Sequence, residues 1–150
     1  MTKDVERLLA DEERGWLALT EVFGDVPPAR FDEPSVTDEG WSPKDVMYHV
    51  AAWAEEAATV LGRIAAGTHR KGGRDVQALN EEWLDVGRGL EDDVVRIRFA
   101  KGRVAMRQAF ARLPEVDANA WEWFDESGPR HYADHLNDLR AFLGRGTDRP

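Results

Sequence analysis

The chain has 150 residues and a formal net charge of −9, with 42% hydrophobic and 33% charged residues. This composition fits one globular domain over residues 1–150 and excludes a disordered chain, while the absence of cysteine excludes disulfides and thiolate-based catalytic or metal sites. The acidic charge argues against nucleic acid as a partner, because phosphate binding uses clustered Lys and Arg.

The first element expected in the chain is a helix over residues 3–23. Its apolar side chains recur at helical spacing, and they are Val5, Leu8, Leu9, Trp16, Leu19 and Phe23. Gly24, Pro27 and Pro28 end the pattern. We therefore expect a loop over residues 25–40.

The clearest start of a helix lies at Ser42-Pro43-Lys44-Asp45. The serine can cap the helix, the proline suits its first position, and the Asp45 carboxylate can reach back to the capping residue. The apolar stripe that follows includes Val46, Val50, Trp53, Ala57, Val60, Leu61 and Ile64. This pattern predicts a helix to Ala66, ended by Gly67, with His49 on the apolar face.

A loop rich in glycine and basic residues follows over residues 68–74, and we interpret its His69 as a surface residue. The next pattern predicts a shorter helix from Asp75 to Val86, ended by Gly87 and Gly89. This segment separates the second long helix from the third.

A third long helix is expected over residues 91–113, before Pro114. Residues 115–127 are expected to be irregular. The last helix should run from about Pro129 to Leu143, with Gly144 closing it and a frayed tail to Pro150. No strand pattern or repeat is visible, so the sequence predicts an all-α four-helix bundle with one extra short helix.

The histidines carry the strongest chemical signal. His131 and His135 are four residues apart, so their imidazoles lie on one face of the last helix, one turn apart. His49 is the candidate third ligand, provided that the N-terminal halves of its helix and of the last helix meet at one end of the bundle. Three imidazoles suit Zn, Ni, Cu, Co or Fe(II) and leave a coordination position open.

Two interpretations compete with a metal-dependent enzyme. One is a non-catalytic helical protein that binds a small molecule or a partner, with a structural metal or none, and the other is an interaction protein in which these histidines are ordinary core residues. Other side chains could belong either to a pocket or to the structure, and they are Asn80, Trp83, Arg98, Trp121, Trp123 and Asp134. For Asp45 we favour capping of the helix over orientation of His49. For Trp121 and Trp123 we favour packing over a position at the mouth of the pocket. Tyr48 and Tyr132 should point about 100° away from their histidine neighbours.

Two segments resemble a known superfamily. Gly40-Trp41-Ser42-Pro43-Lys44-Asp45-Val46-Met47-Tyr48-His49 is similar to the second helix of DinB/YfiT-like proteins. His131-Tyr132-Ala133-Asp134-His135 is similar to their last helix. The resemblance follows the whole chain in order, and Asp75-Val76-Gln77-Ala78-Leu79-Asn80 brings it closest to the DfsB-like and maleylpyruvate-isomerase N-terminal groups.

This resemblance implies a DinB-like four-helix bundle, commonly dimeric, with His49, His131 and His135 as ligands of one divalent metal ion. Zinc or nickel is the expected ion, and a low-molecular-weight thiol is a candidate cofactor. The superfamily includes thiol-dependent transferases and isomerases as well as hydrolase-like members, all acting on small molecules. We expect no counterpart of the additional C-terminal domain of many isomerase-type members, and the choice among these reactions stays open.

The location of the protein is expected to be cytoplasmic. The N-terminal residues are charged and amphipathic and contain no apolar core of a signal peptide. No apolar run approaches the length of about 20 residues that a membrane-spanning helix needs. We therefore expect neither export nor a membrane partner, and no catalytic acid or base can be named from the sequence.

Overall fold

The computed structural model describes residues 2–147 and contains helices without any strand in that range. The elements are α1 (Lys3–Asp25), the short 3-10 helix η1 (Pro28–Arg30), α2 (Pro43–Ala66), α3 (Val76–Arg88), α4 (Asp92–Ala111), α5 (Ala118–Ser127) and α6 (Pro129–Thr147). The expected all-α class is confirmed. Residues 148–150 of the expected frayed tail lie outside the described residues.

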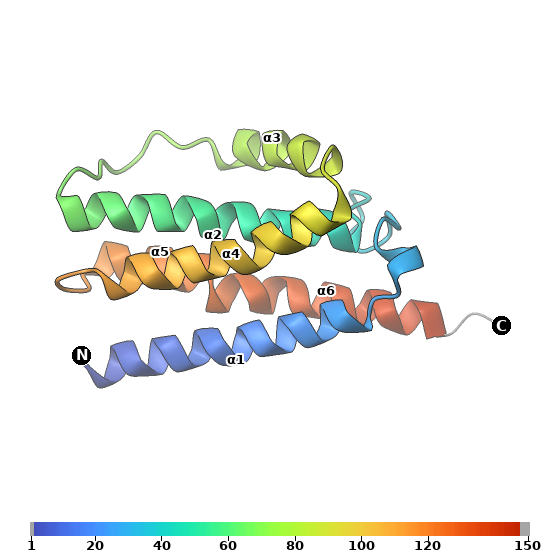
Figure 1. Ribbon diagram of the computed structural model, residues 1–150, viewed down its shortest axis with the longest axis horizontal. Coiled ribbons are helices and arrows are strands. Elements are labelled where there is room, and N and C mark those ends of the chain that lie inside the picture. Colours follow the sequence, from blue (N-terminus) through green and yellow to red (C-terminus); the bar gives the residue numbers. More distant parts are fainter. Residues whose placement is uncertain (1, 148–150) are drawn as a thin grey trace.

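The helices form four columns (Figure 1). α1, α2 and α4 make one column each, and α5 and α6 follow one another to make the fourth. α2 and α4 run in the same direction because α3 carries the chain back along the outside of α2. This is the expected four-helix bundle with a short helix between its second and third long helices.

The core fills the space between the columns with apolar side chains from each of them. Fully buried examples are Leu19, Val46, Val50, Leu61, Val95, Met106, Phe124, Leu139 and Phe142. Removing such side chains from water is the main favourable contribution to folding. No helix among residues 2–147 combines the length and apolarity needed to cross a membrane.

The expected end of α3 at Val86 was wrong, because Gly87 lies inside the helix and is buried, whereas Gly89, also expected to end the helix, is its C-cap. A Cβ atom at Gly87 would approach Cδ1 of Tyr48 to 2.5 Å. Its missing side chain therefore lets α3 pack directly on α2. The helix ends one residue later, at Arg88.

The interpretation of residues 115–127 as irregular was also wrong, because most of this segment is α5. Asp117 begins the helix, and its Oδ1 accepts a hydrogen bond of 2.7 Å from the Ala120 N–H. Ala120 and Phe124, four residues apart, bury their side chains in the bundle. At the other end of the column, α6 does not stop at Leu143 but continues through Gly144 to Thr147.

Candidate metal centre

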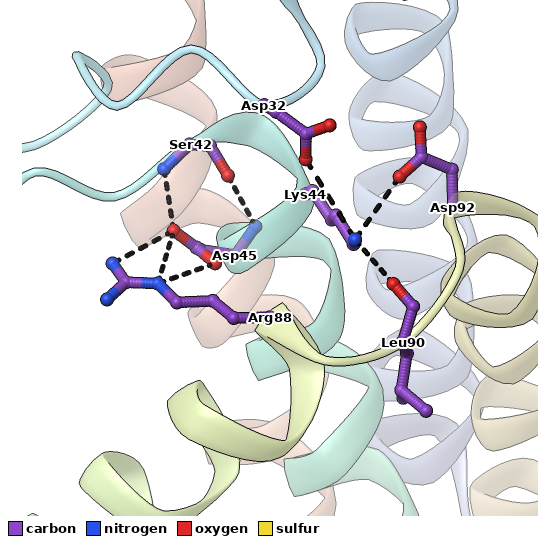
Figure 2. A network of polar contacts seen from close by, with 7 residues as sticks. All are labelled: Asp32, Ser42, Lys44, Asp45, Arg88, Leu90 and Asp92. Carbon is purple, nitrogen blue, oxygen red and sulfur yellow. Dashed lines mark hydrogen bonds and ion pairs between the residues drawn. The ribbon is translucent and has the colours of Figure 1, made fainter.

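The first turn of α2, which precedes His49, is held by the expected capping box (Figure 2). The Ser42 N–H donates to Oδ2 of Asp45 at 2.9 Å, and the Asp45 N–H donates to Oγ of Ser42 at 3.1 Å. Arg88, at the end of α3, adds an ion pair to the same carboxylate at 3.2 Å. Asp45 therefore has a structural role, since its partners are the start of α2 and Arg88 rather than the histidines.

Lys44 fixes the same turn from its other side (Figure 2). Its side chain is buried, donates a hydrogen bond to the Leu90 carbonyl and lies 3.2 Å from Oδ1 of Asp92 at the start of α4. Asp32 in the loop after α1 lies 3.9 Å from the same ammonium group. These contacts join three segments and set the position from which α2 presents His49 one turn later.

The other two histidines are placed by the joint between α5 and α6. A Cβ atom at Gly128 would lie 2.8 Å from the Phe124 carbonyl oxygen, so a side chain here would collide with the last turn of α5 and disturb the joint. α6 begins immediately afterwards at Pro129, and the Tyr132 N–H donates to the Gly128 carbonyl. His131 and His135 therefore lie on the first turns of α6, facing α2.

The structure brings the three candidate histidines together. The ring centroid of His49 lies 4.7 Å from that of His131 and 5.0 Å from that of His135, and the last two are 4.7 Å apart. One nitrogen from each ring lies within 4.8 Å of the other two. The N-terminal halves of α2 and α6 therefore come together. Figure 1 shows that α5 precedes α6 in the same column, so that α6 does not begin at an end of the bundle, where we had expected the two helices to meet.

The polar atoms of this cluster are incompletely satisfied by the protein. Nδ1 of His131 and Nδ1 of His135 are buried and have no hydrogen-bond partner among the described residues. The Trp41 ring packs edge-on against His49 at 5.0 Å between centroids, which offers no acceptor either. Buried polar atoms normally have partners, so unmet nitrogens in a group of three point to a missing ligand.

The electrostatics of the site favour neutral imidazoles. Burial, followed by repulsion from His135, lowers the pKa of His49 to about 3. Burial and the two other histidines hold the pKa of His131 well below its usual range. Burial also lowers the pKa of His135, against the opposing effect of Asp134 and Asp138. The rings are therefore uncharged at neutral pH, the state in which imidazole binds a metal.

The three residues fit a divalent transition metal. Nitrogen ligands suit zinc, nickel or cobalt, and tetrahedral zinc with bonds of about 2.0 Å needs its ligand nitrogens about 3.3 Å apart. The nitrogens present lie within 4.8 Å of one another, so small rotations of the side chains would bring them into range. The protein supplies the ligand type, the protonation state and the approximate spacing.

A pocket of about 740 Å³ opens beside the histidines. Trp53 and Trp123 give it an aromatic wall, and Asn80 and Asn119 contribute amides. An acidic wall consists of Glu122, Glu126 and Asp134. Burial, and then repulsion from Glu122, raises the pKa of Glu126.

The remaining wall of the pocket comes from the loop between α2 and α3, which we had expected over residues 68–74 as a solvated surface loop. His69, which we had interpreted as a surface residue, is half-buried and lines the pocket without joining the three clustered histidines. Arg74 holds the loop in place by an ion pair with Glu56 on α2, and its guanidinium lies 4.9 Å from the ring centroid of Trp123. The sequence does not reveal this wall because it depends on contacts between distant segments.

The other side chains considered from the sequence lie outside the pocket. Trp83 packs against Trp53 with 4.9 Å between ring centroids, and Trp121 packs against the core. Arg98 forms an ion pair of 2.7 Å with Glu55. These contacts match the structural interpretation of all three residues.

Comparison with known proteins gives one family and one fold. Residues 12–141 match the family described as mycothiol maleylpyruvate isomerase N-terminal domain. The fold is similar to the crystal structure of an uncharacterised protein from Escherichia coli UTI89, with a TM-score of 0.79 and 12% sequence identity over 95% of this chain and 94% of that one. At this identity the likeness concerns the fold alone. No curated protein matches the chain.

Proposed function

Because the chain belongs to the mycothiol maleylpyruvate isomerase N-terminal domain family, we propose that it is a metal-dependent enzyme acting on a small molecule. His49, His131 and His135 would hold one divalent ion, with zinc or nickel favoured by the nitrogen ligands. The observation that carries this proposal is the meeting of three neutral imidazoles, two of which have buried nitrogens without partners.

A divalent ion held by three imidazoles keeps a position open, where it can lower the pKa of a bound thiol or water molecule or polarise a carbonyl group. The chain itself supplies the surroundings of that position. Trp53 and Trp123 would exclude water from one side of the substrate, and the loop held by Arg74 would close another.

The reaction that we favour is thiol-dependent transfer or isomerisation of a small electrophile. The family is named for mycothiol and for maleylpyruvate isomerase, which supports a low-molecular-weight thiol as the cosubstrate. Hydrolysis of a small reactive compound uses the same open position and is the second reaction to test. A non-catalytic binding protein with a structural metal or none is the remaining alternative, and without a metal it leaves the unmet nitrogens of His131 and His135 without an explanation.

The test is the metal content per chain, measured by elemental analysis on protein purified without an affinity tag. We expect close to one zinc or nickel ion per chain in the wild type, and loss of the ion in His49→Ala and in His135→Ala. His69→Ala is the matched control, because this histidine lines the same pocket but is not one of the three. No metal in the wild type after incubation with excess ion would overturn the proposal and favour the binding protein.

A further inference from the structure

The side-chain amide of Asn80, near the start of α3, is held in one orientation by Trp53. Oδ1 of Asn80 accepts a hydrogen bond of 2.8 Å from Nε1–H of the indole. Because an indole nitrogen can only donate, the amide oxygen must face Trp53, and the NH₂ group must face away from it.

The NH₂ group of Asn80 therefore offers two donors, and it has no hydrogen-bond partner among the described residues. Asn80 is half-buried and lines the pocket beside the three histidines. A donor pair that is fixed by its neighbour and faces a pocket is the kind of group that orients a ligand. An acceptor on the ligand would replace the water that otherwise satisfies these donors.

Trp53 connects this amide to the candidate metal site. It follows His49 by one turn of α2, so that the two side chains lie on the same face of the helix. Trp83 packs edge-on against its ring at 4.9 Å, and Trp123 lies at 6.5 Å. A ligand that reaches from the histidines to Asn80 would therefore lie along the indole of Trp53.

We propose that Asn80 is a specificity-determining residue that donates a hydrogen bond to an acceptor oxygen of the substrate, with Trp53 as the positioning residue for its amide. The inference rests on the proposed function and narrows its substrate class. The ligand would carry a metal-binding group such as a thiol at one end, a short apolar middle section, and a carbonyl, ester or carboxylate oxygen at the other.

Neutral probes isolate this hydrogen bond from the charges of the pocket. We would load the protein with cobalt(II) and titrate methyl esters of ω-mercapto acids of three chain lengths, each beside an alkanethiol of matched length. The thiolate-to-cobalt absorption band reports binding at the histidines. The ratio of the dissociation constant of each alkanethiol to that of its matched ester reports the contribution of the ester oxygen. In the wild type we expect the ester to bind about five- to tenfold more tightly at one chain length.

Two conservative variants and one control assign the preference to this amide. Asn80→Asp keeps an oxygen for Trp53 but removes both donors, so the ester preference should disappear. Trp53→Phe frees the amide to rotate and should reduce the preference without abolishing it. Asn119→Asp makes the same chemical change in the same pocket and should leave the preference intact, while thermal denaturation checks that each variant is folded.

The outcomes separate this proposal from the proposed function. Suppose that every thiol gives the absorption band. If the wild type then shows no preference for the ester, or if Asn80→Asp shows the same preference as the wild type, the role of Asn80 is overturned and the metal site stands. If Asn119→Asp loses the ester preference to the same extent as Asn80→Asp, the loss is a general effect of the added negative charge, and the role of Asn80 is also overturned. Failure of every thiol to perturb bound cobalt would overturn the proposed ligand class and with it the role of Asn80, whereas the metal site and the hydrolytic reaction would stand.

Discussion

Two clusters of buried polar side chains lie on different faces of α6, and they differ in how their atoms are satisfied. His131 belongs to the three histidines, in which two buried nitrogens have no partner. Its neighbour Tyr132 belongs to the second cluster, where its hydroxyl donates to Glu12 at 2.8 Å. Arg103 and Arg107 also donate to this carboxylate, at 2.7 and 2.6 Å.

The electrostatics of the two clusters differ in the same way. Burial by itself would raise the pKa of Glu12, but hydrogen bonds from Arg103 and Tyr132 outweigh it and hold the pKa below its usual range. The histidines are compensated less: Asp134 and Asp138 act on His135 and the Ser127 backbone acts on His131, yet burial still lowers the pKa of all three. A buried polar cluster that the protein satisfies holds the fold together, whereas one that it leaves unsatisfied is available to a ligand.

The largest effect is expected from Glu12→Ala. This substitution should lower the free energy of unfolding by about 3–5 kcal/mol, because it leaves the half-buried guanidinium groups of Arg103 and Arg107 and the buried hydroxyl of Tyr132 without their acid. Urea denaturation at pH 7 measures it. Glu13→Ala, at the exposed neighbouring position, is the control and should change the value by less than about 0.5 kcal/mol. Equal effects of the two variants would contradict the structural role of the Glu12 cluster.

Acidification of the metal-free protein from pH 7 to pH 5 should have the next largest effect. The three histidines have lower pKa values in the folded protein than in the unfolded chain, where the value is about 6.5. The unfolded chain therefore takes up protons first, and stability that is intact above pH 6.5 is lost as the pH falls. With a folded pKa of about 3, His49 alone should contribute a loss of about 2 kcal/mol at pH 5.

Denaturation in the presence of a chelator at pH 7, 6 and 5 would measure this loss. Glu12 does not interfere, because its lowered pKa confines its contribution to more acidic conditions. His49→Ala should show a shallower dependence on pH than the wild type. Parallel curves for the two proteins would show that His49 is not held neutral by the fold.

The smallest effects are expected from substitutions at two neighbouring residues of α6, which compare the two clusters most directly. His131→Leu should raise the stability of the metal-free protein by about 1 kcal/mol, because it removes a buried nitrogen that has no partner. Tyr132→Phe, at the next residue, should lower it by about 1.5 kcal/mol, because Glu12 loses a hydrogen bond. Urea denaturation of both variants with a chelator present is the measurement, and effects of the same sign would remove the distinction between the clusters.

The parts of the fold that could be predicted have local signals. The start of α2 follows from Ser42, Pro43 and Asp45 within one turn, and the pairing of His131 with His135 follows from helical spacing. His49 was the third candidate because it lies on the apolar face of its helix, and the family resemblance then implied the same ligand. Glu12 could not be singled out among 29 acidic residues, because its partners lie 91 to 120 positions away.

The errors have physical causes as well. Gly87 was taken as a helix end because an isolated glycine is a breaker, but here it permits close packing on Tyr48. α5 was missed because its three closely spaced aromatic residues obscured the spacing of Ala120 and Phe124, although Asp117 was available as a cap. The pocket wall over residues 68–75 depends on Arg74 reaching Glu56 and Trp123, which no local pattern encodes.

The joint at Gly128 has a consequence for how proteins of this architecture can change during evolution. It divides one column of the bundle into α6, which presents His131 and His135, and α5, which contributes the pocket residues Asn119, Glu122, Trp123 and Glu126. Because the helix is interrupted between them, α5 can shift or exchange side chains without turning α6. We expect related proteins to diversify along α5 while α6 is preserved, so that the pocket can accept new ligands around an unchanged group of three histidines.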